Sequence, residues 1–272
     1  MRIVTLGDLL LDVIVRPAEP LTQGADAIAE TITSPGGQAA NVAAWAVELG
    51  GEGRVVAKVG SDPAGTLVVD AVEAQGVEAP GPRTGDRTGV VVSIVSPDGD
   101  RTMASDRGSA RELEADELTE AWFADCDWLH VTAYAVMSSP IDVAVDRATA
   151  FARRHGAQVS LDLSAWTRIR DYGPSRFGER VERLAPDVVF GTEREWEVVD
   201  GHVRPPTMVT KRGARGVRVR AGGENRDLPA VEGPVVDSTG AGDAFAAGYL
   251  VGGVEAGLEA AARCVGKPGA MP

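Results

Sequence analysis

The chain has 272 residues, of which 44% are hydrophobic and 25% are charged. This length accommodates one large domain, or one with a small appendage, and the composition is that of a soluble globular protein. With 27 basic and 40 acidic residues, the formal charge of −13 argues against unspecific nucleic-acid binding, because such binding needs Lys and Arg to neutralise phosphates.

Short apolar runs alternate with longer segments of helical periodicity along the chain. Strands are predicted over residues 3–6, 54–59, 128–131, 158–161, 188–190 and 208–210. Helices are predicted over residues 38–49, 63–75, 140–154, 176–184, 192–199, 241–251 and 255–265. This alternation predicts an α/β fold of three layers, in which helices cover both faces of a mostly parallel central sheet.

Two segments, about 12–35 and 86–105, lack helical periodicity. In the second, the β-branched run 88–95, the turn-forming residues 96–100 and the run 101–104 predict a hairpin. We expect the two segments to form a small β-sheet that stands off the main body as a lid over a site. The chain, residues 1–272, is then a single domain that carries this lid.

The sequence also bears on the cellular compartment. No apolar run has the length needed to cross a bilayer, and the first residues do not resemble a signal peptide, because acid follows a short apolar run. The two cysteines, Cys126 and Cys264, are far apart and match no metal-ligand spacing. We expect buried free thiols and a cytoplasmic protein without a membrane or nucleic-acid partner.

The most informative motif lies at residues 237–245, which read Asp-Ser-Thr-Gly-Ala-Gly-Asp-Ala-Phe and open the predicted helix 241–251. Small residues at a helix start leave N–H groups unpaired, and with the helix dipole these form an anion site. Gly240 and Gly242 allow the backbone to approach a phosphate closely. Asp243 beside such a site is suited to phosphoryl transfer, as the base that takes the proton of an attacking hydroxyl.

Two other nucleotide motifs are excluded. No lysine follows the glycines as it does in a Walker A loop, and Gly7-Asp8 lacks the further glycines of a dinucleotide fingerprint. An isolated Gly-x-Gly-Asp would more simply be a helix start with a favourable acid. The complete run over residues 237–245 favours the catalytic interpretation.

The sequence resembles the ribokinase-like (pfkB-type) family of carbohydrate and nucleoside kinases. Residues 237–245 match the C-terminal signature of that family, and residues 36–41, Gly-Gly-Gln-Ala-Ala-Asn, resemble its N-terminal signature. Residues 60–65 also resemble its Gly-x-Asp-x-x-Gly segment. The likeness extends from Gly7 to about Gly269 and implies a ribokinase-like three-layer α/β/α fold with a lid.

The resemblance assigns residues to an acceptor site. Asp12 stands where the family binds substrate hydroxyls, and Gly36, Gly37 and Asn41 would line the same pocket. A carboxylate and an amide suit a polyol, because together they accept from and donate to hydroxyls. Arg107, which follows the predicted hairpin, either reaches the substrate or is a solvated loop residue.

The resemblance also implies a nucleotide and metal site. The catalytic set is Asp243 with Gly240, Ala241 and Gly242, and the nucleotide is expected along Lys211, Gly213, Thr239, Gly240 and Gly242. Glu195 would hold Mg²⁺, through water, beside the phosphates of ATP. Thr192 stands where the family usually has Asn. Asp237 is a candidate for a monovalent cation such as K⁺, as in some members.

The acceptor is left open by the sequence. A ribokinase- or fructokinase-like activity is the first expectation, because no basic cluster lies near Asp12 and Asn41 in the sequence. A nucleoside such as adenosine is an alternative that would need an aromatic shelf, for which Trp45, Trp166 and Tyr134 are candidates. A phosphosugar or a keto-sugar acid, to which arginines at 83, 87, 101 and 107 would be suited, is a further alternative. A non-catalytic sugar-binding regulator and a homodimer formed through the lid also remain open.

Overall fold

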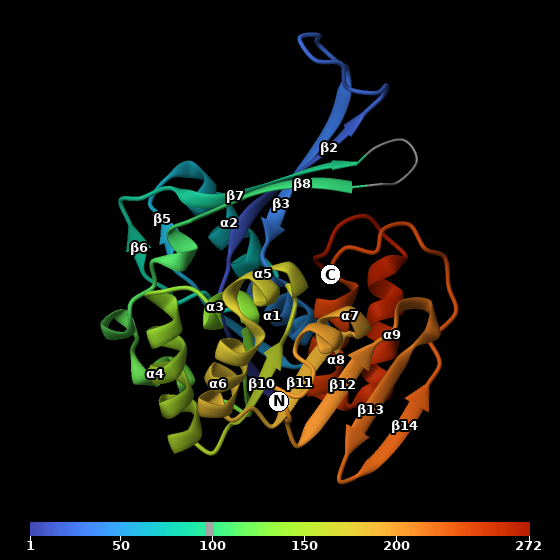
Figure 1. Ribbon diagram of the computed structural model, residues 1–272. Coiled ribbons are helices and arrows are strands. Elements are labelled where there is room, and N and C mark those ends of the chain that lie inside the picture. Colours follow the sequence, from blue (N-terminus) through green and yellow to red (C-terminus); the bar gives the residue numbers. More distant parts are fainter. Residues whose placement is uncertain (96–100) are drawn as a thin grey trace.

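The computed structural model describes residues 1–95 and 101–272 of the chain, so the predicted turn at 96–100 lies outside the described residues. The core is an eight-stranded sheet of order β14-β13-β12-β11-β10-β9-β1-β4 (Figure 1). Its parallel strands are β1 (Arg2–Leu6), β4 (Glu52–Val56), β9 (Trp128–Thr132), β10 (Gln158–Asp162), β11 (Val188–Thr192) and β12 (Thr207–Lys211). The antiparallel strands β13 (Val217–Ala221) and β14 (Glu224–Leu228) extend one edge.

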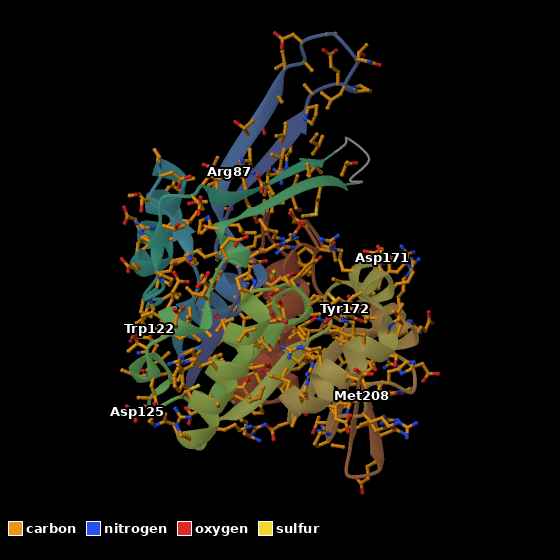
Figure 2. The ribbon with its side chains drawn as sticks, turned by 60° about the vertical axis from the view of Figure 1, so that its left-hand side comes forward. Arg87, Trp122, Asp125, Asp171, Tyr172 and Met208 are labelled. Atoms are coloured by element: carbon orange, nitrogen blue, oxygen red, sulfur yellow. The ribbon has the colours of Figure 1, made fainter. Side chains whose placement is uncertain are left out.

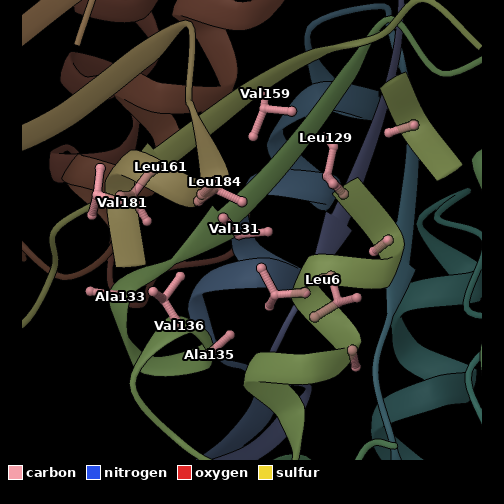
Figure 3. Close-up of a cluster of buried hydrophobic side chains, with 14 of the residues drawn as sticks. Leu6, Leu129, Val131, Ala133, Ala135, Val136, Val159, Leu161, Val181 and Leu184 are labelled. Atoms are coloured by element: carbon pink, nitrogen blue, oxygen red, sulfur yellow. The ribbon is translucent and has the colours of Figure 1, made fainter. Parts of the chain in front are cut away.

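Helices cover both faces of this sheet, as the alternation predicts. One face carries α1 (Gln38–Glu48), α8 (Ala241–Gly252) and α9 (Val254–Val265), whose side chains pack against Ile3 and Phe190. The opposite face carries α3 (Ala133–Val136), α4 (Ile141–Arg154), α5 (Trp166–Tyr172), α6 (Pro174–Leu184) and α7 (Glu193–Val198). Figure 3 shows part of the buried cluster on this second face, including Leu129, Val131 and Leu161. The three-layer prediction is confirmed.

A second, smaller sheet of order β3-β2-β7-β8 projects from the main body (Figure 1). Its strands are β2 (Leu10–Pro17), β3 (Ala29–Gly36), β7 (Thr88–Val95) and β8 (Arg101–Gly108). β2 pairs with β7 in parallel, while β3 and β8 pair antiparallel on the outside. The two β-rich segments of the sequence therefore form one sheet. Arg107 lies within β8 and not in a loop after the hairpin, which corrects the sequence interpretation.

Some boundaries differ from the sequence prediction. The predicted strand 54–59 ends as β4 at Val56, and Val59–Gly60 (β5) pairs instead with Arg83–Thr84 (β6). The edge hairpin of β13 and β14 and the helix α5 were not predicted. Helix α2 (Pro63–Ala74) begins as expected, with Asp62 as its N-cap accepting from the Gly65 N–H at 2.8 Å. Three short 3₁₀ turns, η1 (Ser109–Arg111), η2 (Ala115–Glu117) and η3 (Glu120–Phe123), precede β9, and η4 (Gly213–Arg215) follows β12.

The parallel strands place polar residues at their carboxyl ends, which lie together at one end of the sheet. Asp8 follows β1, Tyr134 follows β9, and Asp162, Thr192 and Lys211 end their own strands. In open α/β sheets, ligands bind outside the carboxyl ends of the strands. The small sheet rises from the same end, since β2 begins directly after β1.

Candidate active site

The start of α8 has the geometry of an anion site. Gly240 is the N-cap residue, with φ of +75°, and a Cβ there would lie 2.5 Å from Ala270 Cβ. A left-handed backbone and this close contact both require glycine. The first N–H groups of the helix have no intrahelical partner, and the Ala241 N–H donates to Ser238 O of the preceding loop at 3.4 Å. The loop before the helix is held by Asp237, which accepts from Thr239 N at 2.8 Å and from Gly269 N at 3.1 Å.

Asp243 lies in the first turn of α8, buried against α1. Asp243 is only 7% exposed, and Asn41 Nδ2 donates to Asp243 Oδ2 at 2.7 Å. Burial raises the pKa of Asp243 to about 7, and the hydrogen bond from Asn41 opposes that rise. An acid with this pKa exchanges protons readily near neutral pH, as a general base must.

A buried ion pair faces Asp243 from the sheet. Lys211 Nζ lies 2.5 Å from Asp162 Oδ2, and Asp162 is 2% exposed. The Ser164 N–H and hydroxyl bind the other oxygen of Asp162, both at 3.0 Å. A Cβ at Gly242 would lie 3.1 Å from Lys211 Nζ, so the ammonium borders the helix start. The Asp162 carboxylate thus fixes a cation beside the anion site.

Lys211 is surrounded by carboxylates. Burial alone lowers the pKa of Lys211, but the charges of Asp162, Glu195 and Asp243 outweigh burial and raise it. Burial, together with the charge of Asp162, raises the pKa of Glu195. The lysine therefore stays positively charged. Acidic side chains outnumber basic ones in this cluster.

Glu195 and Thr192 form the start of α7. Thr192 is the N-cap: its Oγ1 accepts from Glu195 N at 3.3 Å, and the Thr192 N–H donates to Glu195 Oε2 at 2.7 Å. This reciprocal pair is a capping box. Thr192 therefore supplies a capping oxygen at this helix start.

Phosphoryl transfer from ATP requires a divalent metal ion. The residues here suit an ion whose ligands come mostly from the substrate. Within the described residues, no group of three His, Cys, Asp or Glu side chains is spaced to hold a metal. Mg²⁺ is commonly bound by one or two carboxylates with phosphates and water. The buried carboxylate of Glu195 is suited to that role.

The acceptor residues meet around the two glycines before α1. A Cβ at Gly36 would overlap the Asp12 carboxylate, and one at Gly37, whose φ is +98°, would lie 2.5 Å from the Asp8 carbonyl oxygen. Glycine at both positions thus lets β3 and α1 approach the acids. Burial raises the pKa of Asp12 to about 6, and its charge acts on Asp243. Asp12, Asn41 and Asp243 are therefore brought together.

Arg107 joins this pocket through Asp8. Its guanidinium is 13% exposed and forms an ion pair with the Asp8 carboxylate, and it stacks 4.0 Å from the centre of the Tyr134 ring. Burial lowers the pKa of Arg107, but arginine remains charged. The solvated-loop interpretation of Arg107 is therefore wrong. Arg107 also lines, with Arg111, a cavity of about 580 Å³.

Gly213 differs from the other sequence candidates. It begins the η4 turn after β12 with φ of +58°, and a Cβ there would meet no atom within 4 Å. The turn explains the glycine, and no contact joins it to Asp243. Two residues of the site, Asp8 and Asp162, were missed by the sequence analysis, and Tyr134 was named there only as a possible aromatic shelf. Each lies at the end of a parallel strand or two residues beyond it, and that position was the available signal.

Comparison with known proteins places the chain in a family. The model for the pfkB family carbohydrate kinases matches residues 1–270. The chain belongs to this family. The predicted resemblance is confirmed, and the chain is a phosphotransferase that acts on an alcohol group.

Two curated relatives match nearly the whole chain. The ATP-dependent ribose-1-phosphate kinase of Halopiger xanaduensis is 29% identical, over 97% of this chain and 90% of its own length. A fructokinase of Escherichia coli is 28% identical, over 94% of this chain and 86% of its own length.

Solved structures share the ribokinase-like fold. Adenosine kinase from Sinorhizobium meliloti has a TM-score of 0.86 at 24% identity, covering 99% of this chain and 95% of its own. Fructokinase from Xylella fastidiosa with bound ATP has a TM-score of 0.84 at 22% identity, covering 100% and 95%.

Proposed function

We propose that this pfkB-family kinase transfers the γ-phosphoryl group of ATP to a hydroxyl of a small sugar, with Asp243 as the general base. The observation that carries this proposal is the environment of Asp243. Its carboxylate is buried, is held by Asn41 at 2.7 Å, and lies at the N-terminus of α8 beside Lys211. Such a site joins a base to donors for phosphoryl oxygens, which is the pairing that the reaction needs.

The proposed reaction proceeds by in-line attack. The acceptor hydroxyl, held by Asp12 and Asn41 beside Gly36 and Gly37, gives its proton to Asp243, and its oxygen forms a bond to the γ-phosphorus. The bond from that phosphorus to the β-phosphate oxygen breaks, and ADP leaves. The N–H groups of Gly240, Ala241 and Gly242 bind the oxygens of the transferring group, where negative charge is concentrated.

Lys211 is assigned to the nucleotide side of this reaction. Its ammonium borders Gly242, so it can neutralise a phosphoryl oxygen held at the helix start. Thr239 and the turn at Gly213 extend the same surface as candidate nucleotide contacts. Mg²⁺, held by Glu195 through water, would offset the charge of the β- and γ-phosphates. The ATP carried by the fructokinase relative in its structure supports ATP as the donor.

A sugar is favoured over a nucleoside as the acceptor. Of the three aromatic residues that could shelve a base, Trp45 is buried, and an arginine already occupies a face of Trp166 and of Tyr134. Trp45 is 1% exposed and donates from Nε1 to Ala270 O at 2.8 Å. The ring of Trp166 lies under Arg194 at 3.6 Å, and that of Tyr134 under Arg107 at 4.0 Å. Base stacking would need one of these faces.

Three further expectations accompany the kinase proposal. A monovalent cation such as K⁺ at the Asp237 loop would make turnover depend on K⁺ at constant ionic strength. A homodimer through the lid is supported by exposed Ile28, Ile32 and Met103 on or near the small sheet, and sedimentation measures it. A cytoplasmic location is supported by the two free, buried cysteines. Within the described residues, no helix is both long and apolar enough to span a bilayer.

The proposal is tested by ADP release from ATP and Mg²⁺ over a panel of sugars, sugar phosphates, sugar acids and adenosine. We expect ADP release that requires an acceptor, and a phosphate ester identified by mass spectrometry. Binding of ATP without turnover of any acceptor would instead support a non-catalytic sugar- or nucleotide-binding protein.

A further inference from the structure

Arginine side chains gather beside the acceptor half of the site. Arg107 is buried against Tyr134 and paired with Asp8. Two more arginines, Arg111 of η1 and Arg168 of α5, are near enough for their charges to act on Arg107. Arg107 and Arg111 come from the adjoining elements β8 and η1, and Arg168 comes from α5, which is distant in the sequence.

Two of these arginines have no counterion among the described residues. Within the described part of the chain, neither Arg111 nor Arg168 has a hydrogen bond or ion pair to a carboxylate. Asp86, Asp106 and Glu112 line the same cavity as Arg107 and Arg111. Asp106 pairs with Arg87, and among the described residues neither Asp86 nor Glu112 is within ion-pair distance of Arg107 or Arg111. Like charges beside a buried guanidinium repel it. This arrangement has no evident structural benefit to the free protein.

Neighbouring arginines are satisfied in ordinary ways. Arg87, at the base of the small sheet (Figure 2), pairs with Asp106 at 2.7 Å. Arg83 donates to the Gly65 carbonyl oxygen at 2.8 Å, and Arg170 pairs with Asp171 at 2.8 Å. Among the described residues, exposed arginines such as Arg183, Arg204 and Arg220 also have no ion pair. Arg111 and Arg168 differ from these because their charges act on the buried Arg107.

On the basis of the kinase function proposed above, we propose that the acceptor is a sugar bearing an anionic group, which Arg107, Arg111 and Arg168 bind at the edge of the acceptor pocket. The group is a phosphate ester or a carboxylate, because the guanidinium fork fits the oxygens of either one. Asp8 already offsets the charge of Arg107. Arg111 and Arg168 therefore carry most of the selectivity.

The position of the arginines sets the orientation of the acceptor. The anionic end lies toward Arg107, the hydroxyls of the sugar toward Asp12 and Asn41, and the reacting hydroxyl toward Asp243. The phosphoryl group is thus added at a hydroxyl remote from the existing anion. The product carries two anionic groups, either as a bisphosphate or as a phosphorylated sugar acid.

The test compares Arg111→Gln and Arg168→Gln with Arg147→Gln, which removes the same charge from an exposed position on α4. Three sets of acceptors are offered with ATP: ribose 1-phosphate and fructose 6-phosphate, 2-keto-3-deoxygluconate and gluconate, and neutral ribose and fructose. We expect the wild-type enzyme to prefer an anionic acceptor. Arg111→Gln and Arg168→Gln should each lower kcat/KM for it about 10- to 100-fold, the value of a hydrogen bond to a charged group. Arg147→Gln should change it less than about twofold.

A binding measurement separates this proposal from the kinase function. The melting temperature of the wild-type protein should rise with the preferred anionic acceptor, and Arg111→Gln and Arg168→Gln should reduce the rise. A sugar phosphate or a sugar acid as the preferred compound supports the proposal equally and identifies the group. Preference for a neutral sugar, unchanged in the two variants, overturns the anionic acceptor and leaves the kinase intact. Arginine-dependent binding without turnover supports the anion site and overturns the kinase function. No shift and no turnover with any anionic compound overturns the anion site.

Discussion

The phosphoryl-transfer half and the acceptor half of the site carry opposite excesses of charge. In the first, the carboxylates of Asp162, Glu195 and Asp243 surround the single ammonium of Lys211. In the second, Arg107 is joined by Arg111 and Arg168, and its own partner is Asp8. The acidic half has to receive ATP, which is itself an anion. Its charge explains why a cation must accompany the nucleotide there, whereas an anionic acceptor would find its counterions already in place.

The two halves also differ in how the chain builds them. The phosphoryl-transfer half relies on backbone N–H groups of one helix start, whose positions follow from local sequence. The acceptor half is assembled from β2, β8, η1, α1, α3 and α5. Its geometry depends on how the small sheet sits over the carboxyl ends of the large one (Figure 1). The anion site of the reaction is therefore a local property of the chain, whereas its ion pair and the choice of acceptor depend on the whole fold.

The largest expected effect is the loss of kcat caused by Asp243→Asn in the phosphoryl-transfer half. The amide cannot take the proton of the acceptor hydroxyl, so we expect kcat to fall about 10³-fold, measured by ADP release at pH 8. The variant should still bind ATP, because the N–H groups of α8 and Lys211 are unchanged.

Stability is the control for this variant. Because the pKa of Asp243 is raised to about 7 in the folded protein from 3.8, the carboxylate weakens folding progressively as pH rises from about 4 to 7. Asp243→Asn should therefore not lower the melting temperature at pH 8. A rate within a few fold of wild type would remove Asp243 from the mechanism.

The next largest effect tests whether Lys211 and Asp162 act on Asp243. The acidic limb of kcat/KM should fall about tenfold per pH unit below about 7, as Asp243 becomes protonated. Lys211 lowers the pKa of Asp243 and Asp162 raises it. Lys211→Met should therefore move the limb to higher pH, with a loss of about 10²-fold at neutral pH, and Asp162→Asn should move it to lower pH.

Opposite movements of the limb are the decisive result, because a merely structural defect would not reverse sign between the two variants. Lys211→Arg keeps the charge and is the matched control. Asp12 and Cys264 also face Asp243, and they are unchanged in all three variants. If the acidic limb moved in the same direction in Lys211→Met and Asp162→Asn, the ion pair would not control the pKa of Asp243.

The difference between the halves also explains what the sequence could predict. Residues 237–245 are contiguous, so the anion site and its acid could be found from the chain alone. The alternation of short apolar runs with segments of helical periodicity was enough to predict the three layers, and β-branched residues indicated the small sheet. Asp162 could not be found in this way, because it is a single acid at the end of a buried strand. Its meaning comes from the order β12-β11-β10, which brings it to Lys211.

Other misses have local physical causes. β13 and β14 form an exposed edge hairpin rich in charged residues, and such strands lack the apolar runs that mark buried ones. Arg107 was assigned to a loop because the strand that contains it continues past the predicted hairpin end. Arg111 and Arg168 have no motif. They are related to the site only by the folded structure, in which their charges act on Arg107.

The smallest expected effect concerns Thr192, where the chain departs from the usual family residue in the acidic half. As the N-cap of α7, Thr192 accepts from Glu195 N at 3.3 Å. Thr192→Ala should lower the free energy of unfolding by about 1 kcal/mol, and Thr192→Asn should change it by no more than about 0.5 kcal/mol, since Asn caps at least as well. Urea unfolding measures both values.

Activity then decides what the Thr192 side chain contributes. The backbone N–H of Thr192 still holds Glu195 Oε2 at 2.7 Å in either variant, so we expect kcat/KM to stay within about threefold of wild type. A tenfold loss in Thr192→Ala, recovered in Thr192→Asn, would mean that the side-chain oxygen takes part in binding ATP or its metal. The acidic half would then depend on side chains beyond Lys211 and its three carboxylates, and the contrast with the acceptor half would narrow.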